Sequence, residues 1–97
     1  MSNLRQAIGQ ALKARRNQQG LSLRALSAKA KVSLGFLSEI ERGQKEASSE
    51  LLKAITIALE IPLSQVVSQA ANVLAKAEQA EQSVVVNLPV KSQERAA

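Results

Sequence analysis

Residues 22–42, SLRALSAKAKVSLGFLSEIER, decide the fold. Each half of this stretch begins with a serine that can cap a helix, Ser22 or Ser33, followed by apolar residues at helical spacing. A short break of two residues separates the halves. The pattern predicts two short helices joined by a tight turn, over residues 23–30 and 34–42.

Three more helices are expected around this pair. Gly20 closes the first, because glycine readily takes the left-handed backbone found at helix ends. A residue before proline avoids helical backbone, so Ile61-Pro62 closes the fourth. The expected ranges are residues 4–17, from Ser48 or Ser49 to Ile61, and from Ser64 to about residue 82. The sequence therefore predicts an all-α, five-helix domain with an extended C-terminal helix and a short irregular tail.

Helical spacing also predicts which side chains face the core. They are apolar and recur every three or four residues within each helix. They are Leu4, Ile8, Ala11, Leu12, Leu23, Leu26, Ala30, Phe36, Leu37, Ile40, Leu51, Leu52, Ile55, Ile57, Ala58 and Leu59.

The 97 residues contain no cysteine, histidine or aspartate. This composition removes thiolate nucleophiles, histidine bases, Ser-His-Asp triads and the usual zinc and calcium ligand sets. We therefore expect no enzyme, no bound metal and no cofactor. No stretch resembles a signal peptide or approaches the roughly 18 apolar residues that cross a bilayer. We expect a cytoplasmic protein that makes no membrane contact.

Positive charge is concentrated in the first half of the chain. Residues 1–47 carry nine Lys and Arg against three Glu, whereas residues 48–97 carry four against five. A basic half joined to a near-neutral half indicates a surface for a polyanion and a separate region for packing or assembly. A solvated basic surface without a partner is the alternative.

Two short helices joined by a tight turn are the arrangement of a helix-turn-helix motif, whose second helix enters the major groove of DNA. Here its predicted outward residues are Ser33, Leu34, Gly35, Ser38 and Glu39. Gly35 costs about 1 kcal/mol relative to alanine in a helix, and close approach to another surface would explain that cost. In the groove, Leu34 suits a thymine methyl group, Ser38 several base edges, and Glu39 cytosine N4. Contact of Leu34 within the protein and a surface ion pair of Glu39 are the alternatives.

The fifth helix carries an apolar seam at heptad-like spacing. Its members are Leu63, Val67, Ala70, Leu74 and Ala77. One small domain needs only the first turns of this seam, so we predict a dimer interface formed by Val67, Ala70, Leu74 and Ala77. The expected division is a DNA-binding domain over 4–66, a dimerisation helix over 67–82 and a tail over 83–97. A helix that lies on its own core, or frays, is the alternative.

Residues 20–65 resemble the lambda-repressor/Cro, or XRE, family of helix-turn-helix regulators. The matching positions are Gly20-Leu21-Ser22, Leu26, Val32-Ser33, Leu37, Ile40-Glu41-Arg42-Gly43, residues 51–59 and Ile61-Pro62-Leu63. The stretch VSLGFLSEIERGQKEASSELL and the long last helix are most similar to the regulators of Clp-protease genes in actinobacteria. This resemblance implies a sequence-specific transcriptional regulator that activates genes of the Clp protease and of other proteostasis functions.

The family resemblance also implies roles for single residues. It places phosphate contacts at Arg42, Gln44 and Lys45, and at the helix starts near Ser22 and Ser48. It implies an ion pair between Arg16 and Glu41 that joins the first helix to the third. Most members have a glutamine after the serine that caps the second helix; here Leu23 stands there, and Arg24 is the expected replacement contact. Further candidates for phosphate contact are Lys13, Arg15, Lys29 and Lys31.

The leading hypothesis is a homodimer on a pseudo-palindromic operator in double-stranded DNA, with half-sites about 34 Å apart. RNA polymerase and Clp protease are further candidate partners, the latter because Ala96-Ala97 resembles a protease-recognition end; a frayed end is the alternative. A different hypothesis is an antitoxin-like module that binds a protein through VVVNLPV, residues 84–90, with secondary DNA binding. RNA binding is disfavoured because Phe36 is the only aromatic residue.

Overall fold

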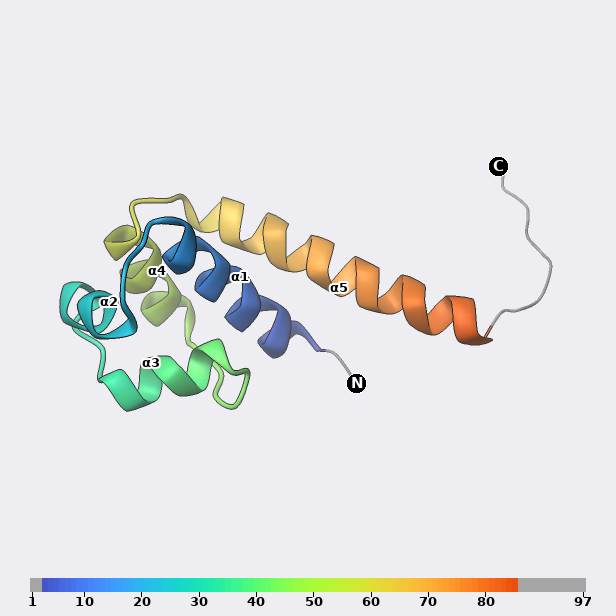
Figure 1. The fold of residues 1–97 in the computed structure, drawn as a ribbon, viewed down its shortest axis with the longest axis horizontal. Coiled ribbons are helices and arrows are strands. Elements are labelled where there is room, and N and C mark those ends of the chain that lie inside the picture. The colour runs from blue at the N-terminus through green and yellow to red at the C-terminus, as the bar shows by residue number, and fades with distance from the viewer. Residues whose placement is uncertain (1–2, 86–97) are drawn as a thin grey trace.

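The computed structural model describes residues 3–85, which form five α-helices (Figure 1). The helices are α1 (Leu4–Gln18), α2 (Leu23–Ala30), α3 (Leu34–Glu41), α4 (Ser49–Ala58) and α5 (Leu63–Val85). The first four gather at one end of the molecule, whereas α5 packs along α1 and then extends beyond it. The predicted all-α fold with an extended last helix is confirmed for this part of the chain.

Side-chain caps fix where the first four helices begin. Ser22, Ser33 and Ser48 each accept a hydrogen bond from the backbone N–H three residues later, at 3.0 to 3.1 Å. Asn3 caps α1 in the same way, at 2.8 Å. Each cap satisfies one N–H group that a helix start otherwise leaves without a partner. The caps predicted at Ser22 and Ser33 are confirmed.

The turn between α2 and α3 is closed by Ser27. Its carbonyl oxygen accepts from the N–H of Val32 at 3.1 Å, and its hydroxyl donates to the carbonyl oxygen of Val32. Lys31 takes left-handed backbone, with φ 59°, and so turns the chain sharply. These contacts hold the two helices of the pair in a fixed relation.

All five helices contribute to the core. The fully buried large side chains are Leu12, Leu26, Leu37, Ile40, Ile55, Leu59 and Val66. Two side chains that we predicted to face the core do not, because Leu4 is 57% exposed and Ile57 is 72% exposed. Ile57 lies two residues after the buried Ile55, which places it on the other side of the helix. Leu4 lies one turn before Ala7, where the buried face of α1 begins.

Two glycines let α1 lie directly on the end of α3. A Cβ atom at Gly9 would lie 2.4 Å from the carbonyl oxygen of Ile40 and 2.7 Å from that of Glu41. A Cβ atom at Gly43 would lie 2.7 Å from Cγ of Gln6, and Gly43 also has φ 75°. Only glycine permits contacts this close, so both positions depend on the missing side chain.

The inner face of α5 differs from the predicted seam. Val66 and Ala70 are buried, at 0% and 1% exposure, in the core of their own chain, so the assignment of Ala70 to a dimer interface is wrong. Val67 is 51% exposed, and Leu74 and Ala77 are half-buried. The predicted seam therefore contained residues from two neighbouring faces of the helix, one in the core and one towards solvent. Apolar residues spaced by three and four positions cover an arc wide enough to include both faces.

The helix α5 is continuous from Leu63 to Val85 and ends three residues beyond the predicted residue 82. The boundary predicted at residue 67, between the DNA-binding domain and the dimerisation segment, lies within this one continuous helix. Residues 86–97, which include Ala96-Ala97 and most of the predicted VVVNLPV arm, lie outside the described residues.

Within residues 3–85, no single helix combines the length and apolar character needed to cross a membrane. Within these residues, α4 and Leu63–Ala80 of α5 have the required length and apolar character only when taken together, and a bend of 106° separates them. In the same part of the chain, no three Asp, Glu, His or Cys side chains lie where they could hold a metal ion.

Replacing Gly9 with alanine should destabilise the fold, although alanine is the better helix former. The new methyl group would collide with carbonyl oxygens of α3, and overpacking of this kind typically costs about 1–3 kcal/mol. Gly35→Ala is the matched control. Apart from its chain neighbours and the adjacent backbone of α3, no described residue comes within 4 Å of the added Cβ, so alanine there should gain about 1 kcal/mol. Urea unfolding should show shifts of opposite sign; shifts of the same sign would contradict the close contact of α1 with α3.

Candidate nucleic-acid interface

The outward face of α3 is open to solvent. Ser33 and Gly35 are exposed, and Leu34, Ser38 and Glu39 are half-buried. Leu34 and Ser38 are four residues apart, as are Gly35 and Glu39, so the members of each pair are neighbours on the helix surface. Among the described residues, packing does not require glycine at position 35, because a Cβ there would have open space around it. The five residues predicted to contact bases therefore lie together on one accessible surface.

The turn after α3 is fixed to that helix by its backbone. The N–H groups of Gln44 and Lys45 both donate to the carbonyl oxygen of Glu39, at 2.8 and 3.3 Å. The guanidinium of Arg42 donates from Nη1 to Oγ of Ser38, and from Nη2 to Oε1 of Gln44 at 3.2 Å. Three residues predicted to contact phosphates are thus exposed directly beside the predicted base contacts.

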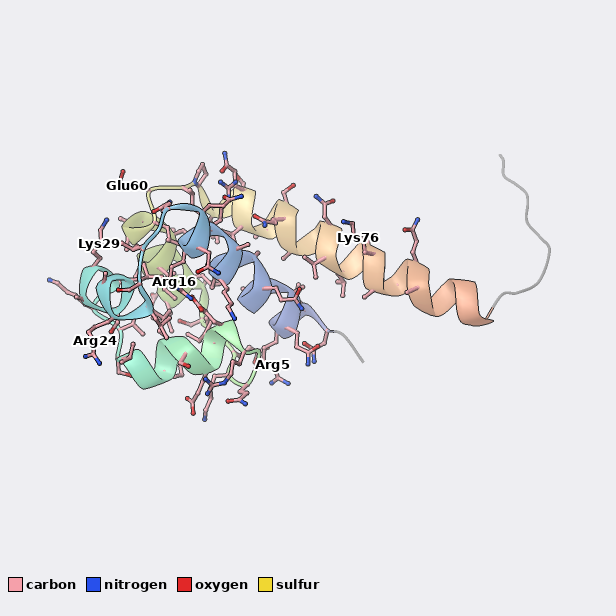
Figure 2. All side chains as sticks on the ribbon, in the orientation of Figure 1. Arg5, Arg16, Arg24, Lys29, Glu60 and Lys76 are labelled. Carbon is pink, nitrogen blue, oxygen red and sulfur yellow. The ribbon has the colours of Figure 1, made fainter. Side chains whose placement is uncertain are left out.

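Helix starts supply further groups that suit an anion. Ser22 and Ser48 cap α2 and α4, whose first-turn N–H groups form the positive end of each helix dipole. Arg24 lies in the first turn of α2, is exposed, and projects on the same side of the molecule as α3 (Figure 2). Arg24 is therefore available to an anion bound along α3.

Arg5 is a basic residue to which the sequence analysis gave no role. It lies in the first turn of α1, on the α3 side of the molecule in Figure 2. With Lys45 and Glu46 it lines a small pocket whose other members are Leu4, Ile8, Ile40 and Ala47. The sequence shows only a basic residue near a helix start. The closeness of Arg5 to Lys45 follows from the way α1 crosses the end of α3.

Two other basic candidates are engaged elsewhere. Lys29 lies 3.8 Å from the carboxylate of Glu60, and Figure 2 shows both away from α3. Arg15 donates from Nη2 to Oε1 of Gln65, in α5, at 2.8 Å. The structure therefore separates these two cations from the surface around α3. The remaining candidates, Lys13 and Lys31, are exposed.

Arg16 connects three parts of the chain. Its Nε and Nη2 donate to Oε2 and Oε1 of Glu41 at 2.7 and 3.0 Å, and the two side chains are only 12% and 5% exposed. Its Nη1 donates to the carbonyl oxygen of Leu21 at 2.9 Å. Hydrogen bonding to Glu41 raises the pKa of Arg16 and outweighs burial, which acts in the opposite direction. The ion pair implied by the family resemblance is present, and it joins α1 to the end of α3 and to the loop before α2.

Comparison with known proteins gives consistent matches. A helix-turn-helix family model, HTH_3, matches residues 12–66. The transcriptional regulator ClgR of Mycobacterium tuberculosis is 52% identical over 75 residues, which are 77% of this chain and 67% of that protein. The crystal structure of the clp gene regulator ClgR from Corynebacterium glutamicum matches with a TM-score of 0.80 at 42% identity, over 88% of this chain and 92% of that one.

A more distant structure shares the fold. The restriction-modification controller protein C.Esp1396I, solved as a tetramer with its natural 35 base-pair operator, matches with a TM-score of 0.65 at 20% identity. The match covers 73% of this chain and 99% of that one, and it concerns the fold alone. Together, the matches confirm the predicted all-α fold of the lambda-repressor type.

Glu41→Ala should lower the free energy of unfolding by about 3 kcal/mol, because it leaves the largely buried charge of Arg16 without its carboxylate. Glu78→Ala, on an exposed position of α5, is the matched control and should change stability by less than about 0.5 kcal/mol. Urea unfolding measures both variants under one set of conditions. Equal stability of the two would show that the ion pair does not hold α3 on α1.

Proposed function

Because this chain belongs to the XRE-type helix-turn-helix family of DNA-binding transcriptional regulators, we propose that it recognises a pseudo-palindromic operator in double-stranded DNA as a homodimer. The observation that carries the proposal is the accessible face of α3, on which a glycine stands that internal packing does not require. Two copies related by a two-fold axis would present two α3 helices to successive major grooves, about 34 Å apart.

Three side chains on this face offer different contacts to base edges. Leu34 provides an apolar surface for a thymine methyl group, the hydroxyl of Ser38 can donate or accept, and Glu39 can accept from cytosine N4. All three are half-buried in the free protein, so neighbouring groups already restrict their motion before DNA is bound. At Ser33 and Gly35 the small side chains would let the start of the helix approach the base pairs.

Groups around α3 would hold the sugar-phosphate backbone of the duplex. The side-chain candidates are Arg5, Arg24, Arg42, Gln44 and Lys45. The capped helix starts at Ser22 and Ser48 would add backbone N–H groups, which suit phosphate oxygens. Contacts of this kind position the protein without reading sequence, and they make affinity fall steeply as salt concentration rises.

A second copy of this chain is the partner that we propose for α5. Val67 is 51% exposed, and the half-buried Leu74 and Ala77 follow it along the helix. Ala70 is not part of this surface, since it lies in the core. Burial of Val67 and of the accessible parts of Leu74 and Ala77 between two copies would stabilise a dimer and fix the spacing of the two α3 helices.

The names of two relatives, transcriptional regulator ClgR and clp gene regulator ClgR, suggest the target genes. We propose that this chain likewise regulates genes of the Clp protease and of other proteostasis functions, as an activator that contacts RNA polymerase. The helix α2 carries Arg24 and Lys29 but no acidic residue, so we do not expect activation through an acidic patch on this helix.

Two further hypotheses concern residues outside the described part of the chain. Recognition of this protein by Clp protease would depend on Ala96-Ala97. The antitoxin-like alternative would depend on residues 84–90, most of which lie beyond the last described residue. Both stay predictions from the sequence.

Selection from a random-sequence duplex pool, at fixed near-physiological salt, should recover a two-fold pseudo-palindrome. Half-sites one helical turn apart are expected, because a symmetric dimer presents two identical α3 helices. Sequencing the bound duplexes gives the motif and hence the target genes. Salt-sensitive binding that enriches no motif would contradict the proposal and favour the antitoxin-like module. A single half-site without a symmetry mate would contradict the dimer.

Gly35→Ala should weaken binding to the selected operator by about tenfold, equivalent to about 1.4 kcal/mol, even though it stabilises the fold. The added methyl group projects from the surface that must approach the base pairs. The affinity of the same variant for an unrelated duplex is the internal control. It should change little, because phosphate contacts dominate such binding. Unchanged affinity for the operator would contradict the close approach of α3.

A further inference from the structure

We infer that Arg42 is a positioning residue that presents Ser38 and Gln44 to DNA as hydrogen-bond donors. The inference rests on the proposed function and deepens it, because it states which base atoms Ser38 selects. A family-based assignment would make Arg42 only a phosphate contact. Its observed partners are instead one residue predicted to read bases and one predicted to contact phosphates.

The guanidinium of Arg42 bridges the two elements of the interface. Nη1 donates to Oγ of Ser38 in the third helix, and Nη2 donates to Oε1 of Gln44 in the turn that follows, at 3.2 Å. A guanidinium carries five N–H donors and no acceptor, so it occupies acceptor atoms of its partners and leaves their donors free. The rigid planar fork also fixes the two partners relative to one another.

The bond from Arg42 defines whether the Ser38 hydroxyl acts towards DNA mainly as a hydrogen-bond donor or as an acceptor. A serine hydroxyl has one donor and two acceptor sites. Because Arg42 donates to its oxygen, the O–H group of Ser38 is free to donate outward. Base atoms that accept in the major groove are guanine N7 and O6, adenine N7 and thymine O4. Ser38 should therefore favour these atoms over cytosine N4, which is a donor and could use only the one acceptor site that Arg42 leaves on the hydroxyl.

The same reasoning applies to Gln44. Its Oε1 is occupied by Arg42, so the side-chain NH2 group remains available to donate to a phosphate oxygen. The backbone of Gln44 is itself held to α3 by the 2.8 Å bond from its N–H to the carbonyl oxygen of Glu39. The N–H of Arg42 likewise donates to the carbonyl oxygen of Ser38, at 3.1 Å. The bridge is thus attached to α3 at both ends.

Both partners of Arg42 are uncharged, and this determines the net charge of the site. Neither Ser38 nor Gln44 cancels the charge of Arg42, so the site keeps a cation that attracts the duplex. By donating to these two groups, Arg42 also polarises them and strengthens the hydrogen bonds that they donate in turn. One residue therefore orients a base contact, orients a phosphate contact and supplies long-range attraction.

The test on DNA is a double-mutant cycle with the selected operator. Arg42→Met and Ser38→Ala should each weaken operator binding by about tenfold or more, and the double variant should be no weaker than Arg42→Met alone. Multiplied losses would overturn the inference, since they indicate independent contacts. Lys45→Met combined with Ser38→Ala is the contrasting pair and should show multiplied losses. Lys76→Met, on the part of α5 that Figure 2 shows away from α3, controls for loss of charge.

A conservative variant separates positioning from charge. Arg42→Lys keeps the cation but lacks the planar fork, so it should restore affinity for an unrelated duplex. It should not restore the base preference at the operator position that Ser38 reads. Recovery of that preference by Arg42→Lys would overturn the positioning role.

A measurement without DNA distinguishes failure of this inference from failure of the proposed function. Nitrogen-15 NMR of the free protein should show that Arg42→Met shifts the side-chain NH2 resonances of Gln44, whereas Lys76→Met leaves them in place. Unmoved resonances would overturn the bridge whatever the protein binds. A bridge that is present in a protein selecting no operator motif would overturn the role of Ser38 in base reading together with the proposed function.

Discussion

The carboxyl end of α3 is held on α1 by a buried ion pair and by close contacts at Gly9 and Gly43, and the orientation of the outward face of α3 depends on this junction. Arg16 holds Glu41 with two hydrogen bonds and the carbonyl of Leu21 with a third. At Gly9 the backbone of α1 lies directly against backbone carbonyl groups of α3, and at Gly43 the turn after α3 lies against Gln6 of α1. A buried ion pair adds little net stability compared with apolar packing, but it is costly to break. Its main effect is therefore to fix one orientation of α3.

This junction leaves the outward face of α3 free. The inner residues Leu37 and Ile40 are buried, and the turn beyond the helix returns hydrogen bonds to the carbonyl of Glu39. Arg42 then extends from a fixed position to Ser38 and Gln44. A helix held at its inner face and its end can present small and polar groups outward without loss of order. Preorganisation of this kind lowers the entropic cost of binding.

The sequence predicts those features that depend on neighbouring residues. Serine caps, the tight turn between the paired helices and the length of α2 follow from local pattern, and the structure has them. The pairing of Arg16 with Glu41, 25 residues apart, came from family resemblance, because helical spacing gives no information on contacts between helices.

The incorrect predictions concern side chains whose burial depends on how a helix is oriented against its neighbours. Ile57 and Ala70 were assigned from apolar spacing alone, yet each belongs to a different face from the one predicted. Gly9 and Arg5 were missed because their roles arise only where α1 crosses the end of α3. An apolar stripe on a helix gives a range of about 100° and not the angle at which a neighbour will pack.

The geometry of α5 connects the orientation of one α3 helix to that of a second. At about 1.5 Å per residue, α5 is about 34 Å long and α1 about 22 Å, so α5 extends well beyond the helix it packs on. Val66 and Ala70, in the first turns of α5, are buried in the core, whereas Val67 is exposed. In the dimer that we propose, the α1–α3 junction would set the angle of each recognition helix, and α5 would set the distance between them. An operator with two-fold symmetry requires both values at once, because an error in either would place one α3 helix outside its groove.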